Sequence, residues 1–314
     1  MGAKAIEILV AAIIIGITNG ALIALIAIGY TLVYGIIELI NFAHGDLFML
    51  GTFASLTVLG LLGSKTDAAP GQTPWISLVF ATLGAMIFCG TLNVVTERIA
   101  YRPLRNAPRL APLISAIGMS FIFINIGLFW YGPSPKSYPN LLPRVDFIGL
   151  IFGGDSLIRF TFKDLWVLGL AIPLMLALAW IIKNTKIGKA MRAVAQDREM
   201  ALQMGINVDR VISVTFLLGG ILAGAAAVTY GLYNENTVFT LGFSAGLKAF
   251  TAAVLGGIGN ITGAALGGFM LGLLASLTVT YFGGQWENVG VFSLLVIILV
   301  LRPTGLLGEE TPER

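Results

Sequence analysis

Long apolar runs constrain this chain more than any other feature. Hydrophobic residues make up 57% of its 314 residues and charged residues only 11%, against about 25% charged in a typical globular domain. A helix needs roughly 20 apolar residues to cross about 30 Å of hydrocarbon. The candidate spans are Ile6 to Val33, Leu47 to Leu62, Trp75 to Thr96, Leu110 to Tyr131, Leu165 to Ile182, Val211 to Tyr233, Thr262 to Phe282 and Val289 to Leu301. We therefore predict an all-α polytopic membrane protein of about eight spans, with residues 1–314 forming one transmembrane domain.

The positive charges follow membrane topology. They fall into two clusters, one of Arg98, Arg102, Arg105 and Arg109 and the other of Lys183, Lys186, Lys189, Arg192, Arg198 and Arg210. Positive charge in short loops marks the cytoplasmic side, so both clusters are expected inside and the connection Gly132 to Lys163 outside. Because the charges form no single patch with interleaved aromatics, the net charge of +3 does not indicate nucleic-acid binding.

The placement of the first span is left open by the charges, because Lys4 and Glu7 cancel. No basic segment with a cleavage site opens the chain, so we interpret the first run as a retained span. If Ile6 to Val33 is a complete span, the amino end lies outside and His44 near the inner surface. If residues 30–62 instead form a re-entrant pair, the amino end lies inside and His44 near the midplane.

Two stretches interrupt the helical pattern at membrane depth, residues 35–51 and residues 255–268, the second continuing a short Gly-rich run at Leu247 to Ile258. Broken segments are tolerated in a bundle where the freed backbone faces protein or a water-filled cavity, and transporters place solute pathways there. The candidate pathway or hinge residues are Asn41, His44, Gly45, Asp46, Gly256, Gly257, Gly259 and Asn260.

His44 is the only histidine. Polar groups at membrane depth normally face the bundle interior and have partners. We expect a hydrogen bond to His44 that fixes a helix break beside the pathway, with direct solute contact as the alternative. Asn41 and Asp46 are good N-cap residues and could cap the two half-helices.

Small residues recur at four-residue spacing within the spans. Lipid provides no hydrophobic drive for helices to associate, so close approach through small residues is the usual means. We expect tight packing at Gly16 and Gly20, Gly220 and Gly224, Gly263 and Gly267, and Gly268 and Gly272.

A basic, polar segment from Lys183 to Arg210 separates two spans and has the periodicity of a helix. One arc of that helix holds Arg192, Gln196, Glu199 and Gln203, and the opposite side holds Met191, Val194, Ala195, Ala201 and Leu202. Such a helix can bury one face on its own domain and offer the other to a partner. The alternative is a solvated loop that contacts lipid headgroups.

Motifs for chemistry are weak. Gly242, Ser244 and Gly246 match the G-x-S-x-G pattern of serine hydrolases, but a serine nucleophile needs a nearby base, and no acid partner is indicated for His44. The single cysteine, Cys89, allows no disulfide or metal cluster and is expected in the core. No motif binds a nucleotide or a metal, so no cofactor is expected in this chain.

Three motifs together resemble the permease subunits of branched-chain amino acid ABC importers of the LivH type, and the resemblance covers nearly the whole chain. They are INFAHGDLFMLG at residues 40–51, GKAMRAVAQDREMALQMGI at 188–206 and GLKAFTAAVLGGIGNITGAALGG at 246–268. The resemblance implies half of a translocation pathway in the bacterial inner membrane, paired with a second, LivM-like permease. It also implies two cytoplasmic ATPase subunits that bind ATP and magnesium, and an extracytoplasmic amino-acid-binding protein.

On the same resemblance, the coupling helix that seats in an ATPase groove lies around Glu199, Ala201 and Gly205, with Arg192 and Gln196 before it. Three other functions stay open at this point. They are an ABC permease for a sugar, urea or short amide, a stand-alone channel or ion-coupled transporter, and an intramembrane serine hydrolase.

Overall fold

Eight apolar helices dominate the part of the chain that the computed structural model describes, residues 2–63, 75–105, 107–108, 110–152, 158–302 and 304–308. Their length and composition confirm the prediction of an all-α polytopic fold. The eight are α1 (Gly2–Ile37), α2 (Ala43–Leu61), α3 (Trp75–Thr96), α4 (Leu110–Tyr131), α6 (Phe162–Asn184), α9 (Val208–Asn234), α11 (Ile261–Phe282) and α12 (Glu287–Leu301). The shorter apolar helix α10 (Leu241–Gly256) contains most of the predicted Gly-rich run.

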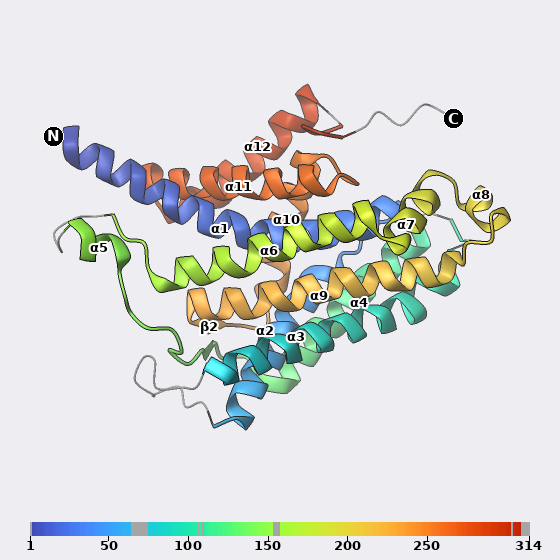
Figure 1. The fold of residues 1–314 in the computed structure, drawn as a ribbon, viewed down its shortest axis with the longest axis horizontal. Coiled ribbons are helices and arrows are strands. Elements are labelled where there is room, and N and C mark those ends of the chain that lie inside the picture. Colours follow the sequence, from blue (N-terminus) through green and yellow to red (C-terminus); the bar gives the residue numbers. More distant parts are fainter. Residues whose placement is uncertain are drawn as a thin grey trace.

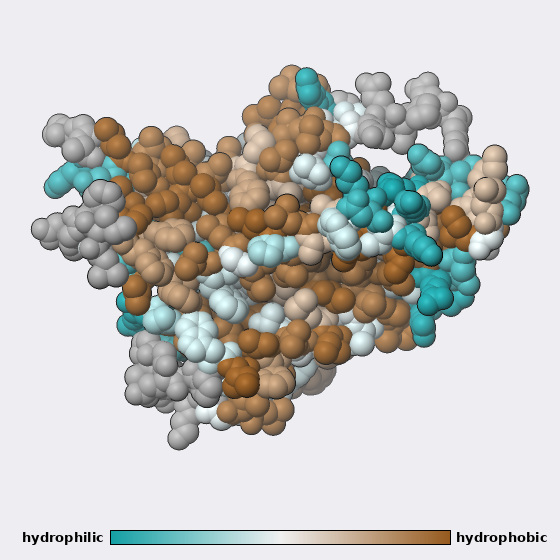
Figure 2. Space-filling view, viewed as in Figure 1, coloured by the Kyte–Doolittle hydropathy of each residue, from teal (hydrophilic) through white to brown (hydrophobic). Residues whose placement is uncertain are grey.

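Most of the long helices, among them α1, α6, α9 and α11, lie side by side along the long axis of the molecule, whereas α12 is inclined to them (Figure 1). A broad hydrophobic band covers the middle of the visible face, and hydrophilic residues gather at the end that carries α7 (Lys186–Gln196) and α8 (Arg198–Gln203) (Figure 2). This arrangement is that of a bundle whose middle faces lipid.

The two basic clusters lie at one end of the bundle, as predicted, except that Arg109 is outside the described residues. At this end Ile37 packs in one buried cluster with Tyr101 and Met191. The carboxyl end of α1 is therefore cytoplasmic by the positive-inside rule, and its amino end is external (Figure 1). This arrangement favours the version with Ile6 to Val33 as a complete span, although α1 extends beyond both of those limits.

Close packing through small residues holds the centre together, as predicted. A Cβ atom added to Gly16 would lie 2.9 Å from the Leu273 Cα, and one added to Gly20 would lie 2.8 Å from the Phe269 Cα. On the other side of the bundle, a Cβ atom on Gly220 would lie 2.8 Å from the Gly90 Cα. α1 therefore touches α11 backbone to backbone, and α9 touches α3 in the same way. Cys89 lies buried in this core.

The two predicted breaks are present. Between α1 and α2, Glu38 adopts a left-handed conformation with φ of 54°. Between α10 and α11 the chain turns through Gly257 and Gly259, with φ of 102° and 99°, values that glycine adopts without the cost a side chain would bring. Both breaks lie toward the cytoplasmic end, and α2 and α11 begin directly after them.

The outer connection folds back onto the bundle. Its strand β1 (Lys136–Ser137) pairs antiparallel with β2 (Asn236–Thr237), and a short helix α5 (Phe147–Phe152) follows. Beside β1, the buried Tyr138 hydroxyl lies 2.6 Å from both the Ser55 Oγ and the Thr52 carbonyl oxygen. Burial raises the pKa of Tyr138, so the phenol stays neutral and donates a hydrogen bond there.

Candidate functional site

The first turn of α2 lies near the middle of the membrane. The Ser120 hydroxyl donates to the Asp46 Oδ2 atom, and Ser120 lies ten residues after the start of α4 at Leu110 and eleven before its end at Tyr131. Asp46 is thus held at the mid-depth of a full span. Since α1 reaches the cytoplasmic end and the chain then returns into the bundle, His44 lies deeper than the complete-span version predicted.

Asp46 is the best-placed polar group for contact with a solute. Its side chain is 1% exposed, and its second carboxylate oxygen, Oδ1, has no hydrogen-bond partner among the described residues. A buried carboxylate oxygen without a partner carries a large desolvation cost. Helix α10 comes close to Asp46 at this point. A Cβ atom on Gly242 would lie only 2.6 Å from the Asp46 Cα.

His44 does not make the hydrogen bond that the sequence led us to expect. Its ring is fully buried next to the Ile26 backbone, and among the described residues neither ring nitrogen has a partner with regular hydrogen-bond geometry. The ring packs edge-on against Tyr30 at a centroid distance of 4.8 Å. It also fills the space over Gly29, where a Cβ atom would lie 2.7 Å from the His44 Cε1 atom. Its observed role is therefore to pack α2 against α1.

Asn41 and Asp46 do not cap helices. The N-cap residue of α2 is Phe42, and no side chain caps this end. The Asn41 amide instead joins two other elements, because its oxygen accepts from the Tyr101 hydroxyl at 3.0 Å and its nitrogen donates to the Asn93 Oδ1 atom at 3.4 Å. Both contacts are long-range, so neither sequence spacing nor capping preference indicated them.

A cavity of about 550 Å³ opens beside Asp46, between α1, α2, α4 and α10. Most of its wall is apolar, and aromatic side chains form a large part of it: Phe42, Phe121, Phe243 and Phe250. The polar atoms come from Tyr30, Asp46, Ser120 and Thr240. Ligand sites of small molecules have this character, a largely apolar pocket of roughly 300–1,000 Å³ with a few placed polar groups.

The glycine-rich pathway candidates lie elsewhere, at the cytoplasmic end. Residues 304–308 cross over them, with the Leu306 amide donating to the Leu255 carbonyl at 2.9 Å and the Leu307 amide to Gly256 at 3.0 Å. The Asn260 side chain donates to the Leu307 carbonyl at 2.9 Å and caps α11 by accepting from the Gly263 amide at 3.0 Å. In this conformation Gly256, Gly257, Gly259 and Asn260 form a turn braced by the chain's own later residues, so of the two proposed roles the position suits a hinge.

The segment from Lys183 to Arg210 contains the two short helices α7 and α8, and the prediction of one continuous helix is wrong. Asp197, with φ of −155°, ends α7 and caps α8, because its carboxylate accepts from the Glu199 and Met200 amides at 2.9 and 3.0 Å. The single-helix arc from Arg192 to Gln203 therefore does not exist as one surface. Gly205 follows α8 with φ of 81° and turns the chain toward α9.

Burial within this segment agrees with the expectation in part. Met191, Val194 and Ala201 are buried, and Arg192, Gln196, Glu199 and Gln203 are exposed. Ala195 and Leu202, expected on the buried side, are exposed. For Leu202 the reason is the break at Asp197, which separates α8 from the helical register of α7. Met200 and Met204 are 61% and 81% exposed, so α8 presents apolar side chains at the aqueous end of the molecule.

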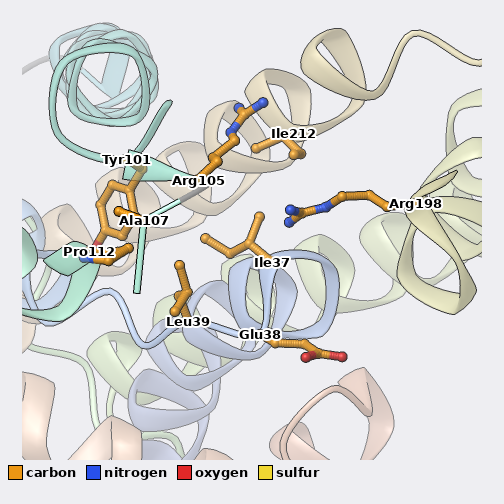
Figure 3. Close-up of a pocket in the computed structure, with 9 residues that line it drawn as sticks. All are labelled: Ile37, Glu38, Leu39, Tyr101, Arg105, Ala107, Pro112, Arg198 and Ile212. Atoms are coloured by element: carbon orange, nitrogen blue, oxygen red, sulfur yellow. The ribbon is translucent and has the colours of Figure 1, made fainter. Parts of the chain in front are cut away.

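A small cavity of about 140 Å³ joins α8 to the carboxyl end of α1. Figure 3 shows the Arg198 guanidinium extending from α8 toward Ile37, with Arg105 and Glu38 on either side. Burial and the nearby Arg105 guanidinium lower the pKa of Arg198, while Glu38 opposes this effect. Helix α8 is thus connected to the break that precedes α2.

Two sets of ion pairs were not predicted from the sequence. Arg105 pairs with both Glu97 and Asp209, and Arg102 also pairs with Asp209. Lys248 of α10 pairs with Glu287, the first residue of α12, at 2.5 Å. The available signal was a charge inside or beside an apolar run, since such groups require a partner at membrane depth.

The serine-hydrolase interpretation has no support in the geometry. The Ser244 hydroxyl donates to the Leu241 carbonyl at 3.1 Å, as helix serines often do, and it lines a different cavity from Asp46. The His44 ring makes no hydrogen bond to it.

Comparison with known proteins gives one consistent result. The family model described as branched-chain amino acid transport system / permease component matches residues 12–301. The chain is 40% identical over 304 residues, 95% of each chain, to the high-affinity branched-chain amino acid transport system permease protein BraD of Pseudomonas aeruginosa. It is 40% identical over 299 residues, also 95% of each, to LivH of Escherichia coli (strain K12). A more distant relative is the nucleoside ABC transporter permease protein NupC of Lactococcus lactis, 26% identical over 84% of each chain.

Proposed function

Because this chain belongs to the family of permease components of branched-chain amino acid transport systems, we propose that it carries branched-chain amino acids across the membrane as half of an ATP-driven import pathway. It is a multi-pass inner-membrane protein and a transport subunit, not a catalytic enzyme. The observation that carries the choice of solute is 40% identity to BraD over 95% of both chains.

The proposed assembly contains four kinds of subunit. A second permease completes the pathway, two ATPase subunits bind ATP and magnesium in the cytoplasm, and an extracytoplasmic binding protein delivers the amino acid. If import is driven by ATP, the ATPases are separate subunits, because the sequence carries no nucleotide-binding motif. The exposed Met200 and Met204 on α8 support a docked partner at that end, because they place apolar surface in contact with water.

In this mechanism the ATPases move α8, and the spans then open the pathway to alternate sides. The cavity beside Asp46 supplies space for a small solute at mid-depth, as in transporters whose sites lie near the membrane midplane. The braced turn at Gly257 and Gly259 provides a point about which α10 and α11 can tilt.

The test is an uptake assay in proteoliposomes. They contain this permease together with the second permease and the ATPases encoded by neighbouring genes, and the binding protein encoded there is added outside. We expect leucine, isoleucine and valine to enter only when ATP is enclosed and the binding protein is present outside. Uptake of a nucleoside in their place would favour the function of the NupC relative. Uptake without ATPases, and failure to copurify with them, would favour a channel or an ion-coupled transporter.

A further inference from the structure

The cavity beside Asp46 combines three features that match the three parts of an apolar α-amino acid. It has one buried carboxylate, one helix amino end without a side-chain cap and one aromatic wall. We propose that it is a binding site in which Asp46 binds the α-ammonium group, the amino end of α10 binds the α-carboxylate and the aromatic wall holds the side chain. This inference deepens the proposed function and rests on it.

The ammonium position is set by the unpartnered oxygen of Asp46. Ser120 occupies the Oδ2 atom, and Oδ1 has no partner among the described residues although the side chain is 1% exposed. An alkylammonium group has three donors and a positive charge, so it satisfies both the hydrogen-bonding capacity and the charge of such a carboxylate. An uncharged sugar would leave the charge uncompensated.

The carboxylate position is set by α10. This helix begins at Leu241, close to the level of Asp46. The Leu241 amide donates to the Val238 carbonyl at 3.0 Å, and no side chain caps the amides that follow it. The first amides of a helix have no partners within it and carry partial positive charge, which suits an anion. Thr240 and Gly242 at this end both line the cavity.

Glycines bring the two half-helices close enough for one small molecule to reach both. A Cβ atom on Gly45 would lie 2.8 Å from the Gly246 Cα, and one on Gly246 would lie 2.9 Å from the Tyr30 hydroxyl. Any side chain at these positions would therefore separate α10 from α2. The carboxylate and the helix end are thus neighbours, like the ammonium and carboxylate groups of one amino acid.

The position of the cavity opening indicates which partner covers the cavity. Phe121 and Phe243 at the mouth are 62% and 67% exposed, so the cavity opens on the lateral surface of this chain. Acyl chains over this opening would leave the Asp46 carboxylate facing hydrocarbon, and charged groups in membrane proteins avoid that environment. The second permease of the proposed assembly would close the site and make it part of a shared pathway.

The experiment measures equilibrium binding of radiolabelled leucine to the complete permease and ATPase complex in nanodiscs, without the binding protein. We expect leucine to bind and unlabelled leucine to compete, while 4-methylpentanoate, which lacks the ammonium group, and 3-methylbutylamine, which lacks the carboxylate, compete weakly. Asp46→Asn should weaken leucine binding about tenfold or more, the size of one charge-assisted hydrogen bond. Asp46→Glu should retain part of the affinity.

Ser244→Ala is the matched control, because Ser244 lies on the same helix but lines the other cavity. We expect its leucine affinity to equal that of the unmodified complex. Basal ATPase activity and elution volume report whether each variant is folded and assembled. A leucine affinity of Asp46→Asn within twofold of that of the unmodified complex would overturn the inference. An equal loss of leucine affinity in Ser244→Ala would overturn it as well.

Uptake by the same complex with its binding protein separates this inference from the proposed function. If the unmodified complex takes up leucine and Asp46→Asn does so with an unchanged KM, the site is wrong and the function stands. If the unmodified complex takes up no branched-chain amino acid, the proposed function itself fails.

Discussion

The buried ion pair between Glu97 and Arg105 should be the strongest polar lock at the cytoplasmic end. The Glu97 side chain is 0% exposed and that of Arg105 only 13%. Glu97 also accepts a 2.8 Å hydrogen bond from the Ser213 hydroxyl on α9. The carboxylate therefore connects the π-helical turn η1 (Glu97–Tyr101), the 3-10 turn η2 (Arg102–Leu104) that precedes Arg105, and α9.

Glu97→Ala leaves the Arg105 guanidinium largely buried with one fewer partner. Breaking a buried ion pair by removing one member costs about 3–5 kcal/mol. Because Arg105 keeps Asp209 as a partner, we expect the lower end, about 3 kcal/mol, which is roughly a hundredfold change in the folding equilibrium. The measurement is reversible unfolding of the purified permease in mixed micelles with increasing SDS, followed by tryptophan fluorescence.

Two further variants make this a test of the buried pair. Arg102→Ala removes a partner from the same Asp209, but at a pair whose side chains are 47% and 48% exposed, so its cost should stay within about 1 kcal/mol. The double variant Glu97→Leu with Arg105→Met should cost less than Glu97→Ala, because no unpaired charge remains buried. If Glu97→Ala costs no more than Arg102→Ala, the reasoning is refuted.

Three other predictions concern packing, the docking helix and the braced turn. Gly268→Leu should prevent folding, because even a Cβ atom at Gly268 would lie 2.5 Å from the Ala24 Cα. Gly118→Ala should be tolerated, because the space around Gly118 is open. The yield of folded protein after purification checks both. Gly205→Ala should cost about 1–2 kcal/mol at φ of 81° and lower leucine uptake per ATP hydrolysed in proteoliposomes, and Gly205→Asn should retain more coupling. Asn260→Ala should cost about 1–2 kcal/mol through loss of the α11 cap, seen as faster proteolysis near residues 304–308; unchanged proteolysis would contradict this.

The helices could be predicted from the sequence because burial in lipid is a local property of each run. The spacing of Gly16 and Gly20 identified a close helix contact for the same reason, since small residues four apart share one helix face. The sequence alone left the orientation of α1 open. It followed from the basic clusters only once the structure placed the carboxyl end of α1 beside them.

The polar contacts could not be predicted, because they depend on which helices become neighbours. Asn41 has the residue type of a cap, yet its partners Asn93 and Tyr101 lie more than fifty residues away in sequence. His44 was expected to be hydrogen-bonded because polar groups at membrane depth usually are, and the structure places its ring against Tyr30 and Gly29 instead. Asp197 was read as one residue of a continuous helix although aspartate is a strong N-cap residue.

The position of Arg198 explains how movement at the docking helix can reach the proposed solute site. Arg198 is the first residue of α8, and its guanidinium lies in the cavity beside Ile37 and Glu38, where α1 ends (Figure 3). From Glu38 only a short segment, residues 39–42, leads to α2 and hence to Asp46. Glu38 holds a left-handed conformation that costs a non-glycine residue energy, so this segment can change conformation when its neighbour moves. In the proposed mechanism, a displacement of α8 by an ATPase would therefore act first on α2, whose opening turn carries Asp46, the carboxylate proposed to bind the ammonium group.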